Sequence, residues 1–213
     1  APWLARFVAS ARPARVAAIA EALSGLLGNA MEAHRAILAE EGALDLIRET
    51  GQLYLYRDRT HYTKDAAGWA LRAQHGLRIE ELDGAAAIRA LEPDMQGEYH
   101  LGLFLPDQGS SVNPRRQAEV VARGVARLGG EVRQAAVTAI ATAGGRAIGV
   151  MTTAGLEPAD QVVVAAGAFS ARLLAPLGLR VPLESQRGYH VMLPDAGISL
   201  SRPVVPADRK AFI

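Results

Sequence analysis

The segment DQVVVAAGAFSARLL, residues 160–174, constrains the fold more than any other part of the chain. The three consecutive valines at 162–164 predict a strand buried on both faces, as in a parallel or largely parallel sheet. This strand would run through the small residues 165–167 into a short helix, which Ser170 caps and Pro176 ends. Open α/β sheets bind ligands where a strand turns into a helix. The segment therefore predicts either a nucleotide site or an ordinary turn whose small residues serve packing.

Composition narrows the classes of function that the chain can have. Its 213 residues, 50% of them hydrophobic, can bury a core in one large or two small domains. The net charge is +1 with no block of like charges, so neither a nucleic-acid surface nor a polybasic membrane patch is indicated. No membrane-spanning stretch or signal peptide is visible, which favours the cytoplasm, with peripheral attachment to the inner membrane as an alternative. The absence of cysteine means that a redox function would need an organic cofactor.

The apolar periodicity predicts helices at the start and a sheet after them. Residues 1–43 have the alanine-rich, amphipathic spacing of helices. Residues 51–58 and 97–110 alternate between apolar and polar or aromatic residues, as strands of one sheet do. Short helical segments are expected between these strands, at 66–75 and 83–91.

The second half of the chain predicts a helix followed by a β-meander. Asn113 and Pro114 are placed to begin an amphipathic helix that ends at Gly129 and Gly130. A strand is expected after this helix, then a hairpin around residues 144–145, and then the valine strand.

Four stretches of this half, taken in order, resemble the amino-acid-oxidising flavoproteins that include D-amino acid dehydrogenase, glycine oxidase and sarcosine oxidase. They are EVVARGVARLGGEV, AVTAI, GRAIGVMTTAG and ADQVVVAAGAFSARLLAPLGLRVPLESQRGYHVML. The earlier pieces PWLARFVASARPARV, GQLYLYRD, LEPDM and GLFLPDQGS fit the D-amino acid dehydrogenase branch. The resemblance covers nearly the whole chain. It implies an FAD cofactor and oxidation of an amino acid or related amine to an imine, then to an oxo acid and ammonia.

The sequence departs from the family at its dinucleotide fingerprint. No Gly-x-Gly-x-x-Gly occurs, and in the family this motif precedes the region with which the chain opens. The strand with the substrate-carboxylate arginine would follow the last residues. We therefore expect a central fragment, inactive in isolation, that needs the rest of the same polypeptide.

The resemblance also implies a fold class and domain boundaries. The expected fold is α/β with α+β character. Its parts are a helical segment at 1–43, a mixed, largely antiparallel substrate-domain sheet at 44–108 and 181–213, and a partial Rossmann-like FAD domain with a β-meander at 109–180.

The resemblance further places individual residues around the cofactor and the substrate. Val137 matches a backbone contact to the adenine, and the turn at 165–167 matches the approach to the phosphate and ribose. The residues expected to contact the cofactor are Val137, Ala165, Ala166 and Gly167, and the substrate-pocket candidates are Arg187, Tyr189, His190 and Phe212. Arg187 and His190 can equally be structural groups. The histidines lack metal-ligand spacing, so no metal is expected, and no catalytic residue is assigned.

Three classes of function remain open at this point. The first is a fragment of a flavin-dependent amino-acid or amine oxidoreductase whose electron acceptor, oxygen or a quinone, is undetermined. The second is the same domain in a tRNA-modifying enzyme, against which the near-neutral charge argues. The third is a binding domain that has lost its cofactor.

Overall fold

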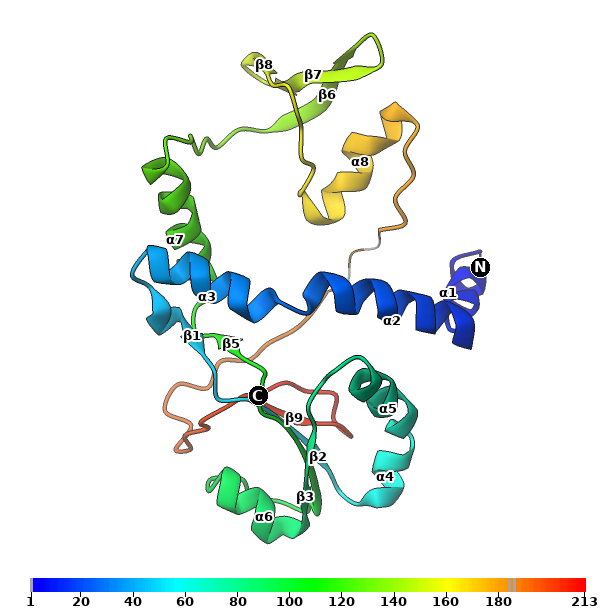
Figure 1. The fold of residues 1–213 in the computed structure, drawn as a ribbon, viewed down its shortest axis with the longest axis vertical. Helices are drawn as coiled ribbons and strands as arrows, with labels where there is room; N and C mark the ends of the chain where they lie inside the picture. Colours follow the sequence, from blue (N-terminus) through cyan, green and yellow to red (C-terminus); the bar gives the residue numbers. More distant parts are fainter. Residues whose placement is uncertain (1, 184, 186) are drawn as a thin grey trace. The chain divides into compact units, whose positions relative to one another are not determined.

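The computed structural model describes residues 2–183, 185 and 187–213, and these fall into two units. Residues 1–130 and 195–213 make the first unit, and residues 131–194 make the second. Figure 1 follows the chain from blue at its start to red at its end. The fold is a mixture of helices and small sheets, which confirms the expected α/β class with α+β character.

The first unit begins with three helices: α1 (Pro2–Ser10), α2 (Pro13–Leu27) and α3 (Ala30–Glu40). Pro13 occupies the start of α2, where its missing N–H has no helical partner to lose. Gly42 follows α3 with φ +64°, a conformation that favours glycine. The described residues of this opening segment are thus mostly helical.

A four-stranded sheet forms the centre of the first unit, in the order β3-β4-β2-β9. Strand β2 (Gln52–Tyr56) pairs antiparallel with β4 (Leu101–Leu105), which pairs antiparallel with β3 (Glu80–Asp83). Strand β9 (Val204–Pro206) lies parallel to β2 at the sheet edge. The two strands predicted from alternation therefore share one mixed, largely antiparallel sheet.

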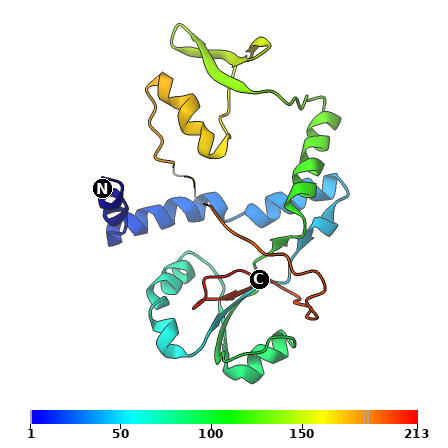
Figure 2. The same cartoon turned by 180° about the vertical axis from the view of Figure 1, so that it is seen from behind.

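Helices cover both faces of this sheet (Figure 1; Figure 2 gives the view from behind). On one face, Trp69 of α5 (Ala66–Gln74) packs on Tyr56, and the short α4 (Arg59–Thr63) adds Tyr62. On the other face, Ile88 of α6 (Gly84–Leu91) packs on Leu53 and Leu55. Alternation of side chains along β2 and β4 supplies both apolar layers.

Helix α7 (Pro114–Arg127) begins as the sequence predicts, because the Asn113 side chain accepts a hydrogen bond from the Arg116 N–H at 3.0 Å. Its Val120 is buried with Leu38 of α3 and with Leu46 of the 3-10 turn η1 (Leu44–Leu46). Two short strands, β1 (Ile47–Arg48) and β5 (Ser110–Ser111), pair nearby. Helix α7 thus belongs to the first unit, although its residues fall within the expected 109–180 segment. The assignment of residue ranges to cofactor and substrate domains stays a prediction.

The second unit contains the predicted β-meander. Strands β6 (Val137–Ala143), β7 (Arg146–Thr152) and β8 (Gly155–Pro158) pair antiparallel in sequence order. The β6–β7 turn has positive φ at Gly144 and Gly145, which explains the glycine pair. The turns η2 (Gly167–Phe169) and η3 (Ala175–Leu177) flank α8 (Ser170–Leu174).

The predicted strand at 162–164 is absent from the described structure. Residues 161–166 have no regular secondary structure, and Val163 is 89% exposed. A β-branched run forms a strand only when a neighbouring strand pairs with its backbone, and no described segment does so here. The strand expected directly after α7 is likewise an irregular segment, residues 130–136.

The range 181–213, expected to contribute to the substrate sheet, is only partly regular. Val191 in this range is exposed and lies outside any strand. Among the described residues of 181–213, β9 is the strand that pairs with the sheet. Glu184 and Gln186 lie outside the described residues.

Candidate functional site

The turn at residues 165–167 is the first part of the candidate cofactor site. Gly167 has φ +54°, a left-handed conformation that strains any residue with a side chain. No described atom lies within 4 Å of the position that a Cβ would take on Gly167. Ala165 and Ala166 are exposed. The backbone here is therefore open to close approach by a bound group, as a dinucleotide contact requires.

The chain entering this turn has free backbone hydrogen-bonding groups. Among the described residues, the only backbone bond from residues 161–166 is that of the Ala166 carbonyl, which accepts from the Phe169 N–H at 3.1 Å. The remaining donors and acceptors are available to another strand, to a ligand or to water.

Val137 lies in the same unit as the turn. It is the first residue of β6, where it pairs with Thr152 of β7 and is 39% exposed. Helix α8, which directly follows the 165–169 turn, contacts β6. The structure thus brings all four cofactor candidates into one small unit, while their contact with FAD stays a prediction.

The substrate-pocket candidates are divided between the two units. Arg187, Tyr189 and His190 lie on an irregular segment of the second unit, and Tyr189 is 88% exposed. No side chain of these three has a hydrogen bond or ion pair to another described residue. Phe212 lies in the first unit and is 69% exposed. Their role in a substrate pocket therefore stays a prediction.

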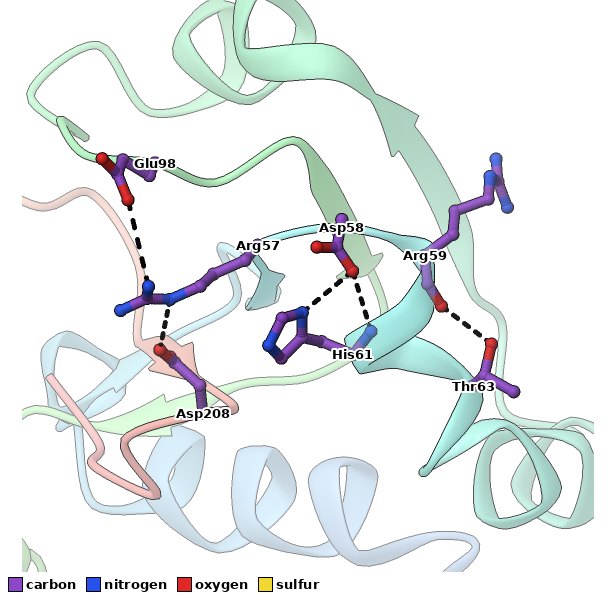
Figure 3. A network of polar contacts seen from close by, with 7 residues as sticks. All are labelled: Arg57, Asp58, Arg59, His61, Thr63, Glu98 and Asp208. Carbon is purple, nitrogen blue, oxygen red and sulfur yellow. Dashed lines mark hydrogen bonds and ion pairs between the residues drawn. The ribbon is translucent and has the colours of Figure 1, made fainter.

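A polar network that sequence reasoning missed lies at the end of β2 (Figure 3). The Arg57 Nε donates to Asp208 Oδ2 at 2.9 Å, across 151 residues of sequence. Asp58 accepts at 2.9 Å from the His61 N–H and lies at the same distance from His61 Nδ1. These hydrogen bonds from His61 hold the pKa of the Asp58 carboxyl below its usual range. The pair of Arg57 and Asp208 joins distant segments, so local pattern gives no signal for it, whereas Asp58 caps the start of α4 through a local contact.

A buried ion pair is the second feature that the sequence did not reveal. Glu92 is 1% exposed and accepts from Arg202 Nε at 3.0 Å and from Ser201 Oγ at 2.7 Å. Arg202 also donates to the carbonyls of Thr50 and Leu91. With its donors engaged in this way, Arg202 serves structure rather than ligand binding.

No group of three or more histidine or acidic side chains in the described ranges is arranged to hold a metal ion. None of the helices in the same ranges is long and apolar enough to cross a membrane.

The chain is an α/β protein made of two units. The first holds a mixed sheet, and the second holds a β-meander and the open turn. The chain belongs to the FAD dependent oxidoreductase family, whose model matches residues 4–213.

Curated relatives are named for amino-acid oxidation. A D-amino-acid oxidase from Bradyrhizobium diazoefficiens is 32% identical over 213 residues, which is 100% of this chain and 50% of that protein. A D-amino acid dehydrogenase from Rhodopseudomonas palustris is 29% identical over 199 residues, covering 90% of this chain and 46% of that protein. The chain thus spans about half the length of the curated relatives it matches.

Solved structures show the same fold at low sequence identity. L-proline dehydrogenase from P. horikoshii superimposes with a TM-score of 0.66 at 15% identity, covering 85% of this chain and 50% of that one. Glycine oxidase from Bacillus cereus superimposes with a TM-score of 0.60 at 18% identity, covering 78% of this chain and 44% of that one.

Proposed function

We propose that the chain is part of a flavin-dependent oxidoreductase that oxidises the C–N bond of an amino acid or related amine to an imine. Water then converts the imine to an oxo acid and ammonia. The observation that carries this proposal is the match of residues 4–213 to the FAD dependent oxidoreductase family. It is supported by relatives that are named D-amino-acid oxidase and D-amino acid dehydrogenase.

The chain's own residues would contribute binding and orientation. The backbone of Ala165, Ala166 and Gly167, together with that of Val137, would hold FAD, because small residues and an exposed turn let a dinucleotide approach. When bound, the flavin supplies the acceptor for the hydride of the substrate's α-carbon.

Other residues of the chain would position the substrate. Arg187, Tyr189 and His190 would lie near the flavin ring, and Phe212 would form part of the pocket wall. Their task would be to orient the amine and to exclude water. We assign no residue to proton transfer.

We place this activity in the cytoplasm, with a small amino acid or amine as the substrate. The electron acceptor is either oxygen or a quinone, and the two can be distinguished by whether reduced enzyme is reoxidised in air.

The test uses the full-length, flavin-loaded protein mixed without oxygen with a panel of D-amino acids, L-amino acids and N-methyl amines. We expect one group of the panel to bleach the flavin absorbance. An amino acid would then yield oxo acid and ammonia in equal amounts, whereas an N-methyl amine oxidised at its methyl group would yield formaldehyde and the demethylated amine. The control is 2-aminoisobutyrate, which has no hydrogen on its α-carbon and cannot transfer a hydride. A flavin-loaded protein that no member of the panel reduces would contradict the proposal.

A further inference from the structure

Four aromatic side chains of the first unit form one connected cluster between the sheet and the helices α4 and α5. The rings of Tyr54 and Trp69 meet edge to face with their centroids 4.7 Å apart. The rings of Tyr56 and Tyr62 do the same at 5.6 Å. The Trp69 Nε1–H donates to the Tyr56 hydroxyl at 2.7 Å and so joins the two pairs. The cluster is therefore a continuous path of π-systems, linked by ring contacts and one hydrogen bond.

The members of this path differ in their exposure to solvent. Tyr56 and Trp69 at its centre are 2% and 4% exposed, whereas Tyr54 and Tyr62 are half-buried. An oxidant that removes an electron from either half-buried tyrosine leaves an electron vacancy, which can pass inward through the ring contacts. Burial then separates an oxidised side chain at the centre from other molecules in solution.

A proton acceptor lies on the hydroxyl of Tyr56. This hydroxyl donates to Asp65 Oδ2 at 3.0 Å, and within the described ranges Tyr56 is the member of the cluster that donates to a carboxylate. Burial raises the pKa of Tyr56 to about 12, so its phenol is neutral at physiological pH. A neutral phenol becomes a strong acid when it loses an electron. A carboxylate already at hydrogen-bond distance can take the released proton without moving.

Two charges favour Tyr56 over Trp69 as the place where the vacancy rests. The Arg72 guanidinium carbon lies 4.6 Å from the centroid of the Trp69 ring, and a cation there opposes positive charge on an oxidised indole. The Asp65 carboxylate, on the hydroxyl of Tyr56, has the opposite effect on the phenol. All of these contacts lie within residues 54–72 of the first unit.

We propose that Tyr56 is a redox-active tyrosine, at which the cluster collects the oxidising equivalent of a peroxyl-class radical. The radical takes one electron and becomes an anion. The O–H bond of Tyr56 breaks and an O–H bond to Asp65 forms, which leaves a neutral phenoxyl radical beside a carboxylic acid. A soluble one-electron reductant, a thiolate or ascorbate, reverses the step as Asp65 returns the proton. The inference does not rest on the proposed function, because neither flavin nor amino acid takes part in it.

The test is pulse radiolysis of the full-length, flavin-loaded protein with azidyl radicals, which are soluble one-electron oxidants, in fewer numbers than protein chains. Phenoxyl radical is followed by its absorbance and by electron paramagnetic resonance of rapidly frozen samples. We expect a phenoxyl component that grows in a first-order phase, independent of protein concentration, and then persists. Tyr56→Phe should lose this component. Asp65→Asn, whose amide takes up no proton, should slow its growth about a hundredfold.

The matched control is Tyr99→Phe, because Tyr99 packs against the separate cluster of Leu53 and Leu55. It should behave as the wild type does. Asp65→Asn should keep the wild-type circular dichroism, since the Asp65 side chain makes no capping bond to α5 and asparagine suits that position equally. This variant therefore tests the proposal even if Tyr56→Phe folds poorly. Persistence of the component in folded Tyr56→Phe, or its growth at the wild-type rate in Asp65→Asn, would overturn the proposal.

Discussion

A substitution at Gly167 can act in two ways, through backbone strain or through the bulk of the new side chain. The Gly167 φ of +54° strains every residue that has a side chain, and the space beside it is empty of described atoms. Valine, which is β-branched, would destabilise the turn by about 1–3 kcal/mol through strain alone. Among residues with a side chain, asparagine is one of the least strained in the left-handed conformation, and it still adds bulk at the same place.

We expect Gly167→Asn in the full-length protein to lower flavin content per folded molecule while leaving the melting temperature within a few degrees of wild type. The reason is that its side chain would occupy the path by which the cofactor approaches the backbone. Flavin absorbance and a melting curve on the same sample make the measurement. Gly145→Asn is the control, because Gly145 has φ +76° and equally empty surroundings in the hairpin turn. If both variants keep the wild-type flavin content per folded molecule, the small residues of the turn serve packing and not cofactor approach.

Tyr56 gives a prediction for alkaline pH. Its hydroxyl accepts from Trp69 Nε1 at 2.7 Å and donates to Asp65 at 3.0 Å. Burial, and the neighbouring Asp65, raise the pKa of Tyr56 from 10.0 to about 12. A raised pKa means that the neutral form stabilises the fold below pH 10, and that this stability is lost as pH rises toward 12.

We expect Tyr56→Phe to be less stable than the wild type by about 1–3 kcal/mol at pH 8, because the buried Trp69 N–H loses its acceptor. The difference should shrink between pH 10 and pH 12, where only the wild type must ionise a buried phenol. Urea unfolding curves at pH 8, 10 and 11 measure both effects. A difference that stays constant with pH would show that Tyr56 titrates at its ordinary pKa.

One ion pair joins α6 to the segment that leads into β9. Glu92 follows α6 directly, and Arg202 lies two residues before β9. Because Glu92 is buried, removal of one partner leaves the other charge without compensation. Helix α6 and strand β9 are therefore coupled in stability, although 110 residues separate the pair.

We expect Glu92→Ala to destabilise the full-length protein by about 3–5 kcal/mol, and Glu92→Gln to recover part of that loss through the hydrogen bond to the Ser201 N–H. The exposed pair of Arg115 and Glu119 is the control, since Glu119→Ala should cost less than about 1 kcal/mol. Denaturant unfolding measures all three variants. Equal small losses in Glu92→Ala and Glu119→Ala would contradict the role given to the buried pair.

The same elements show what the sequence could and could not predict. Helices α2 and α7 and strands β2 and β4 follow from apolar periodicity and capping residues, which are local signals. Residues 161–166 carry the local signal of a strand but find no partner strand among the described residues. The pairs Arg57–Asp208 and Glu92–Arg202 depend on which distant segments meet, and side-chain type alone does not determine that.

The part of its relatives that this chain covers affects how tightly it is expected to bind FAD. The chain spans about half of its curated relatives, and its 213 residues contain no Gly-x-Gly-x-x-Gly. That motif delivers a pyrophosphate to a helix N-terminus, where oriented N–H groups and the helix dipole stabilise its charge. The described turn at 165–167 offers close approach, but α8 has only five residues and a correspondingly small dipole.

We therefore expect these 213 residues, produced alone, to hold FAD only weakly and to be colourless after purification, whereas the full-length protein is yellow. Absorbance spectra of both proteins, each compared with its concentration of folded chain from circular dichroism, make the comparison. Dialysis against excess FAD is the control for cofactor that was lost during purification. Should the 213-residue protein retain one flavin per folded chain, the residues described here would suffice for tight binding, and the glycine fingerprint would be dispensable for it.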